Sequence, residues 1–75
     1  MRVVWAADVE RRLRALPALD EQAIRAAVQR FAHRRGSPAE GALMRRLRIA
    51  GHAVVMVLDP DRRTVRVARL SRADR

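Results

Sequence analysis

The spacing of apolar residues changes near residue 40, and this change divides the chain into a helical first half and a strand-rich second half. The first half opens with the β-prone run Arg2–Trp5, which predicts a short strand. Apolar residues then recur four and three positions apart between residues 9 and 16, and this spacing indicates a helix. Asp8 is the expected N-terminal cap of that helix, and Pro17 closes it because proline disrupts a helix interior.

A second helix is predicted from the most regular apolar pattern in the chain. Its apolar residues follow the i, i+3, i+4, i+7 spacing that places them on one face: Ile24, Ala27, Val28 and Phe31. Asp20 is the expected cap, and Leu19 and Ile24 occupy the positions of a hydrophobic staple around it. Gly36 is expected to end the helix, because glycine readily adopts the left-handed conformation of a C-terminal cap.

In the second half of the chain the pattern has a period of two, which indicates strands. Three strands are predicted, over residues 43–49, 52–58 and 64–70, with a turn at residues 59–61 between the last two. The middle strand is apolar on both faces, which is typical of a central strand. Arg69 interrupts the alternation of the last strand, so a β-bulge or an early strand end is expected there.

The predicted order is strand, helix, helix, strand, strand, strand, in a single domain over residues 1–75. This order indicates an α+β fold of two layers, with a helical hairpin on one face of a small antiparallel, partly mixed sheet. The other face of the sheet is then open. If Leu47 and Ile49 pack beneath the helices, Met44, Arg46 and Arg48 point outward, because side chains alternate along a strand.

The charge of the chain adds a functional clue. All 17 basic residues are Arg and there are 8 acidic residues, so the formal net charge is +9. Residues 43–75 hold 9 of the arginines but only 3 of the acidic residues, so two thirds of the surplus charge lies in the strand-rich half. A basic surface of this kind attracts phosphate backbones and acidic proteins alike.

Composition also excludes several classes of protein. With no Cys and only two His, the chain can form neither a disulfide nor a thiolate zinc site, and neither a metal nor a cofactor is expected. No apolar run approaches the ~20 residues that a membrane-spanning helix needs, and no secretory signal is visible, so a cytoplasmic protein is expected. Trp5 and Phe31 are the only aromatic residues, so a single-strand binder that works by base stacking is poorly supported.

The order of elements and several short motifs resemble those of a known family. Residues 46–59, RLRIAGHAVVMVLD, align without gaps to the pattern of the RelE/ParE toxin superfamily, which commonly reads like RLRVGDYRVLYEID. Residues 9–17 are similar to the family's A-x-x-x-L-x-x-L-P helix end, and residues 65–72 resemble its closing segment V-x-V-L-x-V-x-H-R. The resemblance covers nearly the whole chain and is closer to RelE-like than to ParE-like members.

The resemblance implies a toxin of a type II toxin–antitoxin system. RelE-like members cut messenger RNA in the ribosomal A site, ParE-like members inhibit DNA gyrase, and both are silenced by an acidic antitoxin. The implied partners are therefore an acidic antitoxin, in a hetero-oligomer, and mRNA on the ribosome or, in the alternative, DNA gyrase. A general nucleic-acid-binding domain unrelated to toxins is a third hypothesis, which follows from the charge alone.

The resemblance also implies a set of site residues. Arg46 and Arg48 match the basic residues that contact phosphates before the Gly turn, and Arg72 matches the basic residue that closes the last strand, to within one position. The family's Tyr-Arg pair after the turn falls on His52 and Ala53. The expected catalytic residues are Arg46, Arg48, His52 and Arg72, and the expected nucleic-acid contacts are Arg45, Arg46, Arg48, Arg66 and Arg72.

Two departures from the family pattern affect the expected chemistry. Cleavage of RNA through its 2′-hydroxyl needs a base, an acid and cations, and arginine supplies only the last because it stays protonated. His52 is the one plausible titrating group near the sheet. Ala53 replaces the family's transition-state arginine and the chain has no Tyr, while losing one such donor costs about 100- to 1000-fold in rate. A gyrase inhibitor or a degenerate toxin that mainly binds its antitoxin is therefore the alternative to a ribosome-dependent endoribonuclease.

Overall fold

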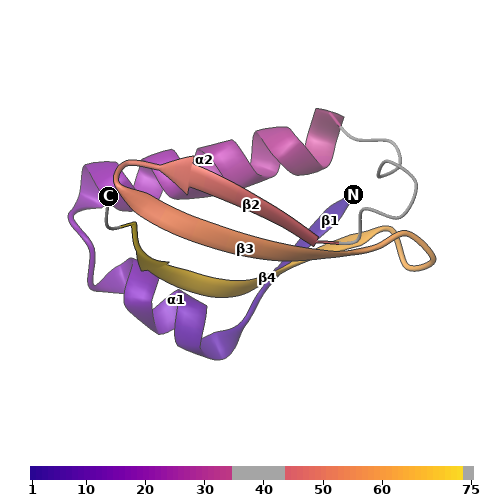
Figure 1. Cartoon of the computed structure of the whole chain (residues 1–75), viewed down its shortest axis with the longest axis horizontal. Helices are drawn as coiled ribbons and strands as arrows, with labels where there is room; N and C mark the ends of the chain where they lie inside the picture. Colours follow the sequence, from indigo (N-terminus) through magenta and orange to yellow (C-terminus); the bar gives the residue numbers. More distant parts are fainter. Residues whose placement is uncertain (35–43, 74–75) are drawn as a thin grey trace.

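A computed structural model describes residues 1–34 and 44–73 of the chain. It contains one strand, two helices and three further strands, in the order expected from the sequence (Figure 1). Gly36 and Leu43, for which the sequence made predictions, lie outside the described residues. The elements are β1 (Arg2–Trp5), α1 (Ala7–Arg14), α2 (Ala18–Arg34), β2 (Met44–Ile49), β3 (His52–Asp59) and β4 (Thr64–Arg72).

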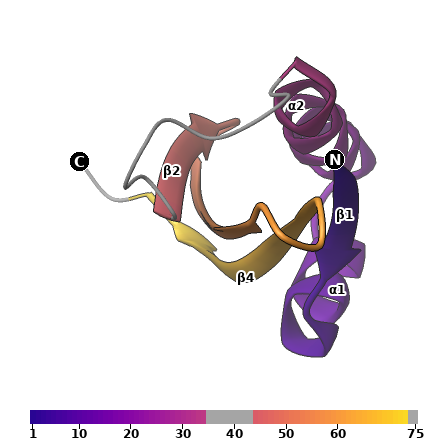
Figure 2. The same cartoon turned by 90° about the vertical axis from the view of Figure 1, so that its right-hand side faces the viewer.

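The four strands form one open, mixed sheet in the order β1-β4-β3-β2. β2 and β4 both run antiparallel to β3, whereas β1 runs parallel to β4, with Val3 opposite Val65. Figure 2 shows the sheet curving from β2 at one end to β1 at the other. β3 and β4 occupy the centre, which confirms the central position expected for the strand over residues 52–58.

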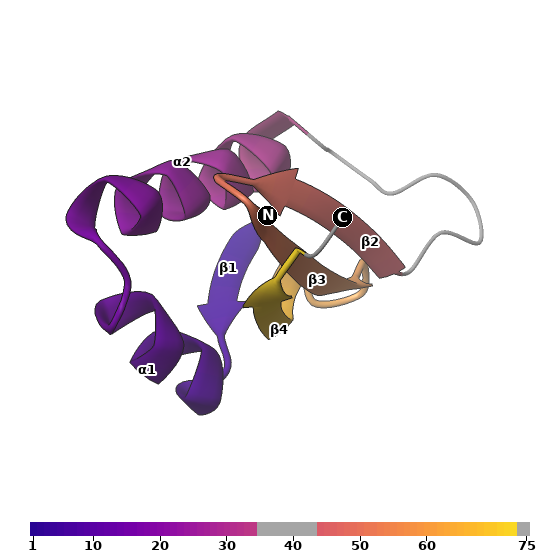
Figure 3. The ribbon, with the colours of Figure 1, turned by 60° about the vertical axis from the view of Figure 1, so that its left-hand side comes forward.

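Both helices pack on the same face of this sheet, which confirms the α+β class (Figure 3). α1 contacts β4, and α2 contacts β1 and β2. Within the described part of the chain no element packs on the opposite face, which we call the open face. Neither helix among these residues is long and apolar enough to cross a membrane.

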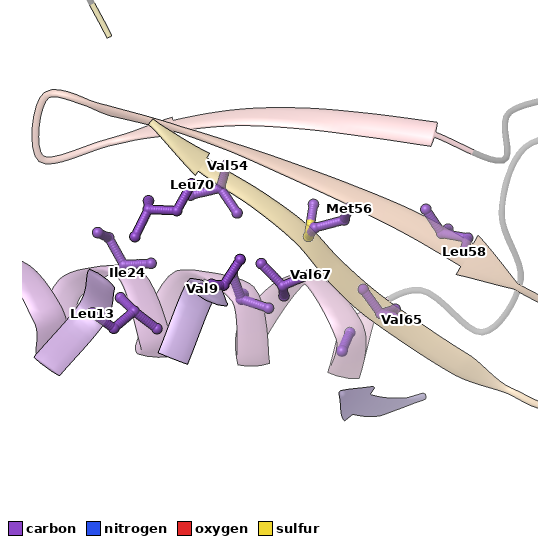
Figure 4. Packing of buried hydrophobic residues seen from close by; sticks show 11 residues of the cluster. Val9, Leu13, Ile24, Val54, Met56, Leu58, Val65, Val67 and Leu70 are labelled. Atoms are coloured by element: carbon purple, nitrogen blue, oxygen red, sulfur yellow. The ribbon is translucent and has the colours of Figure 1, made fainter. Parts of the chain in front are cut away.

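The core is a layer of aliphatic side chains between the helices and the two central strands (Figure 4). None of the described polar or charged side chains is buried, so burial of apolar surface is what holds the helices against the sheet. The apolar positions of the two helices form one side of this layer, and those of β3 and β4 form the other. The buried residues are Val9 and Leu13 of α1, Ile24, Val28 and Ala32 of α2, Val54, Met56 and Leu58 of β3, and Val65, Val67 and Leu70 of β4.

The start of α1 differs from the sequence prediction. The helix begins at Ala7, its N-cap residue is Ala6, and no side chain accepts a capping hydrogen bond. Asp8, the predicted cap, lies in the first turn instead. It still favours the helix there, because a negative charge near the N-terminus complements the helix dipole.

The start of α2 was also predicted too late. The helix begins at Ala18, directly after Pro17, and Asp20 lies within its first turn. Leu19 is 79% exposed, so the predicted staple between Leu19 and Ile24 is wrong. Pro17 explains the difference. The backbone N–H groups at the start of a helix have no partner within it, so the N–H that proline lacks costs nothing there, and the helix can begin directly after Pro17.

A polar cluster links the two helices to β1. The Arg25 guanidinium donates to the carboxylates of Glu10 in α1, at 2.7 Å, and Glu21 in α2, at 3.1 Å. It also lies 5.2 Å from the centre of the Trp5 ring, which allows a cation–π contact. The hydrogen bond from Arg25 holds the pKa of Glu10 below its ordinary value, and the same bond raises the pKa of Arg25.

β4 contains the bulge that Arg69 suggested, and it continues to Arg72. The register shifts between Met56 and Val55, which leaves Ala68 as an extra residue without a partner on β3. Beyond the bulge, Leu70 turns into the core while Arg69 is exposed on the open face. The bulge therefore resolves the conflict between the sequence of this strand and simple alternation.

Candidate nucleic-acid interface

β2 forms one flank of the open face, and its side chains alternate between solvent and core. Arg46 and Arg48 are exposed, whereas Leu47 and Ile49 pack against the core. Met44 shares the outward side with the two arginines. This arrangement confirms the outward row that the alternation of the sequence predicts.

β3 gives the open face a central strip of short apolar side chains. The pairing of β2 with β3 puts Arg46 opposite Val55 and Arg48 opposite Ala53. Val57 continues the strip and is 40% exposed. Because these side chains are short, they leave the longer guanidinium groups of the neighbouring strand free to extend above the sheet.

β4 forms the second flank of the open face. Arg66 lies opposite Val57, and Arg69 lies opposite Val55. Arg66 was among the expected contacts, but the sequence analysis did not assign Arg69 to the site. The break in alternation at Arg69 was the available signal, although only the position of the bulge decides which face this side chain joins.

Together, Arg46, Arg48, Arg66 and Arg69 form what we call the arginine face. Neighbouring strands are about 4.8 Å apart, so the two flanks lie roughly 10 Å from one another across β3. In residues 1–34 and 44–73, none of these four arginines forms a salt bridge; the ion pairs there involve Arg14, Arg25 and Arg62. The arginine face therefore carries uncompensated positive charge on an exposed surface.

Larger apolar side chains are exposed beside the arginine face. Val4 of β1 lies opposite Arg66, which lies opposite Val57, which in turn lies opposite Met44 of β2. Met44 is 64% exposed and Val4 is 38% exposed. A hollow of about 580 Å³ borders Val4, Val57 and Arg66. One row across the sheet thus combines three exposed apolar side chains with a cation.

Arg45 does not join the arginine face. It alternates with Arg46, so it belongs to the side of β2 that carries Leu47 and Ile49, and it is half-buried. The sequence analysis grouped it with the nucleic-acid contacts because of its charge. Its position follows from the two-residue period of a strand, which puts neighbouring residues on opposite faces.

His52 and Arg72 also lie away from the arginine face. They are directly opposite one another on β3 and β4, on the side of the sheet that carries the buried Val54 and Leu70. Both line a cavity of about 480 Å³ at the end of the sheet, next to the connection between the helices. The structure therefore divides the expected catalytic residues, with Arg46 and Arg48 on one face and His52 and Arg72 on the other.

The His52 ring has a defined local contact. Its Nδ1 lies 2.9 Å from the carbonyl oxygen of Ala50 in the turn between β2 and β3. A carbonyl oxygen only accepts hydrogen bonds, so Nδ1 carries a proton and Nε2 has the lone pair when the ring is neutral. Nε2 is therefore the ring nitrogen left for a ligand, on the other side of the sheet from Arg46 and Arg48.

The described residues offer no metal centre. Among residues 1–34 and 44–73, no group of three or more His, Cys, Asp or Glu side chains could hold a metal ion. The candidate site therefore consists of organic cations and apolar side chains. Exposed guanidinium groups without carboxylate partners can bind anions.

Comparison of this chain with protein-family models, with curated proteins and with solved structures found no match. The resemblance to the RelE/ParE superfamily therefore rests on the residue pattern alone. What the arginine face binds has to be argued from its own geometry and charge.

Proposed function

We propose that this protein is a toxin with a RelE-like fold that binds the phosphate backbone of RNA through the arginine face. The observation that carries the proposal is the placement of four exposed arginines, without salt bridges in the described structure, on both flanks of one uncovered sheet face. A planar guanidinium matches the geometry of a phosphate and can bind it with two hydrogen bonds. The family resemblance supplies the expected target, mRNA on the ribosome.

The composition of the open face favours contact with the backbone over recognition of bases. No aromatic side chain lies in its central strip, which consists of Ala53, Val55 and Val57. Base stacking on single strands depends on aromatic platforms, and contacts to phosphates carry no sequence information. We therefore expect binding with strong salt dependence and weak sequence preference.

The arrangement of the site supports binding more strongly than cleavage. His52, the expected proton-transfer group, is on the other side of the sheet from Arg46 and Arg48. Ala53, which is opposite Arg48 at one end of the arginine face, takes the place of the family's transition-state arginine. The expected ribosome-dependent cleavage of mRNA stays a prediction, and a protein of this geometry can inhibit translation by occupying RNA without cutting it.

A salt titration with a labelled single-stranded RNA tests the binding. We expect the double variant Arg46→Gln/Arg48→Gln to bind about 10-fold more weakly, and its log–log salt slope to be smaller by about 1.4, from roughly 0.7 per phosphate contact. The matched control is Arg11→Gln/Arg30→Gln, which removes two exposed helical arginines and leaves the same net charge. An equal loss in both variants would show attraction by overall charge and would overturn the proposed site.

Expression in cells tests the proposed toxicity. Induction of the wild-type chain should arrest growth and translation, and the Arg46→Gln/Arg48→Gln variant should relieve the arrest. Sequencing of RNA ends then separates arrest with cleavage from arrest without it, and accumulated DNA breaks would indicate gyrase as the target instead. Unimpaired growth at high expression would contradict a toxin function.

A second candidate function is the binding of an acidic protein, as in a degenerate toxin that is held by its antitoxin. The row formed by Val4, Arg66, Val57 and Met44 favours this candidate, because a phosphate backbone offers nothing to exposed apolar side chains whereas an amphipathic acidic peptide does. The first observation needed is whether a short, acidic protein is encoded next to this one. If it binds, Val57→Ser/Met44→Ser should weaken that complex and leave RNA binding unchanged.

A further inference from the structure

The cavity at the end of the sheet is a second concave site, separate from the arginine face. It lies where the end of β4 and the β2–β3 turn approach the start of α2, at the left of Figure 1. Its volume of about 480 Å³ is within the range of sites for small organic ligands. Apolar side chains that include Leu16 and Leu70 form part of its wall, and Leu70 itself belongs to the core.

The charged groups around this cavity come from separate elements. Arg12 approaches from α1 and Arg72 from β4, and neither takes part in any ion pair in the described part of the chain. His52 of β3 and Ser71 of β4 also line the wall. Among the described residues that line the cavity, the charged groups are thus two guanidinium groups and the carboxylate of Asp20.

The carboxylate of Asp20 limits the kinds of ligand that can bind in the cavity. A carboxylate repels a phosphate but accepts hydrogen bonds from hydroxyl groups. A ligand that satisfies all of these groups therefore carries an anionic group for Arg12 and Arg72 and hydroxyl groups for Asp20. Its third part is an apolar or planar body that covers Leu16 and Leu70. A nucleoside monophosphate has these three parts, in a phosphate, a ribose and a base.

We infer that the cavity lined by Arg12, Asp20, His52 and Arg72 binds a nucleoside 5′-monophosphate group. A phosphate monoester carries roughly −1.5 to −2 charges at pH 7, which two guanidinium groups can balance. The imidazole of His52 adds a polar contact through Nε2, because Nδ1 is engaged with the Ala50 carbonyl. The inference stands apart from the proposed function, since none of these residues belongs to the arginine face.

The same chemical group can come from a free nucleotide or from the phosphorylated 5′ end of an RNA. The geometry of the cavity points to a nucleoside 5′-monophosphate group, and an experiment then identifies which molecule carries it. Ser71, which lines the cavity, is opposite Ala53 on β3, and Ala53 is opposite Arg48. The cavity wall is therefore two strand pairings away from Arg48, so an RNA bound to the arginine face could extend to it.

Calorimetric or NMR titration with 5′-AMP, adenosine and inorganic phosphate tests the inference on the whole chain. We expect 5′-AMP to bind more tightly than either fragment, because only the nucleotide offers groups both to the two arginines and to Asp20. Arg72→Gln and Arg12→Gln should each weaken 5′-AMP binding by about 10- to 100-fold, as the loss of a charged hydrogen bond does. Asp20→Asn should reduce the advantage of 5′-AMP over inorganic phosphate.

The control variant is Arg11→Gln/Arg30→Gln, which removes the same kind of charge from exposed helix positions that do not line the cavity. We expect it to leave 5′-AMP binding unchanged, and a circular dichroism spectrum of each variant verifies that it is folded. The inference is overturned if 5′-AMP fails to bind, or if its binding is lost in the control and retained in Arg72→Gln. In those results RNA binding by the arginine face could still hold, so the two proposals fail separately.

A pair of short RNAs identifies the source of the phosphate. One carries a 5′-phosphate and the other a 5′-hydroxyl, with the same sequence. Tighter binding of the phosphorylated RNA that disappears in Arg72→Gln would assign the cavity to RNA ends. Equal binding of the two RNAs, together with saturable 5′-AMP binding, would assign it to free nucleotides.

Discussion

Arginine has two roles in this protein: Arg25 holds elements of the fold together, whereas the arginine face is the proposed binding surface. Arg25, at the junction of the helices and β1, donates to Glu10 and Glu21 and lies over Trp5. The arginines of the arginine face have no carboxylate partner within the described residues and point into solvent. A paired cation joins elements together, whereas an unpaired one is available to a ligand. The number of charged residues alone therefore does not show where a binding surface lies.

The largest expected effect contrasts the two faces of β3. Met56 is buried beneath the helices, while its neighbour Val57 is on the open face. We expect Met56→Ala to lower the free energy of unfolding by about 2–5 kcal/mol, because it leaves a cavity in the core. Val57→Ala should cost less than about 1 kcal/mol, and urea denaturation measures both. A similar loss in the two variants would show that the open face is covered in solution.

The second prediction tests whether the β4 flank, whose Arg69 lies on the open face because of the bulge, belongs to the arginine face. We expect Arg66→Gln/Arg69→Gln to weaken RNA binding by about 10-fold, as much as the matching change on β2, because both flanks border the same strip. The free energy of unfolding should not fall, since neither arginine has an ion-pair partner among the described residues. Filter binding or fluorescence anisotropy measures the affinity. Unchanged affinity would restrict the site to β2.

The third prediction concerns pH and the paired arginine. Hydrogen bonding by Arg25 lowers the pKa of Glu10 in the folded protein, so the unfolded chain binds a proton to this residue at a higher pH than the folded chain does. The contribution of Glu10 is therefore complete above its ordinary value of 4.5 and is lost as the pH falls through the lower, folded pKa. Thermal denaturation of wild type and Glu10→Gln across this range should show a smaller acid-induced loss in the variant. Identical pH profiles would contradict a stabilising role for this pair.

The smallest effect is expected at the bulge. Ala68 is the residue without a partner, and its removal would let Val67 and Arg69 follow one another in regular alternation. Leu70 would remain in the core and Arg69 on the open face, so we expect deletion of Ala68 to change the free energy of unfolding by less than about 1 kcal/mol. RNA affinity should also be retained. Unfolding of the deletion variant would show that the bend of the strand, and not only its register, is needed.

The hydrophobic pattern alone was enough to identify all six elements and the class of fold. Each apolar pattern indicates a local preference, as in the four-residue strand at the N-terminus, the apolar face of α2 and the two-residue period of β2 and β3. Burial of these apolar residues on one face requires the same helix or strand that the local preference favours. The helix starts were missed because several residues in a row can begin a helix, and Pro17 permitted a start earlier than the Asp20 cap suggested.

The candidate site could be predicted only in part. The exposure of Arg46 and Arg48 follows from their alternation with Leu47 and Ile49, which the sequence shows directly. The position of Arg69 depends on where the bulge falls, and the separation of His52 and Arg72 from the other arginines depends on strand register. A shift of one residue moves a side chain to the opposite face, so charge and spacing cannot assign it.

The amino-acid order alone is thus enough to predict which segments are helices and strands, and that one strand presents arginines to solvent. The tertiary structure decided which distant residues meet. It brought β4 beside β3 so that Arg66 and Arg69 face Arg46 across a strip of short side chains, and it gathered Arg12, His52 and Arg72 around a cavity at the other side of the sheet. The physical reason is that periodicity encodes burial along one element, whereas pairing and register arise only when the elements pack together.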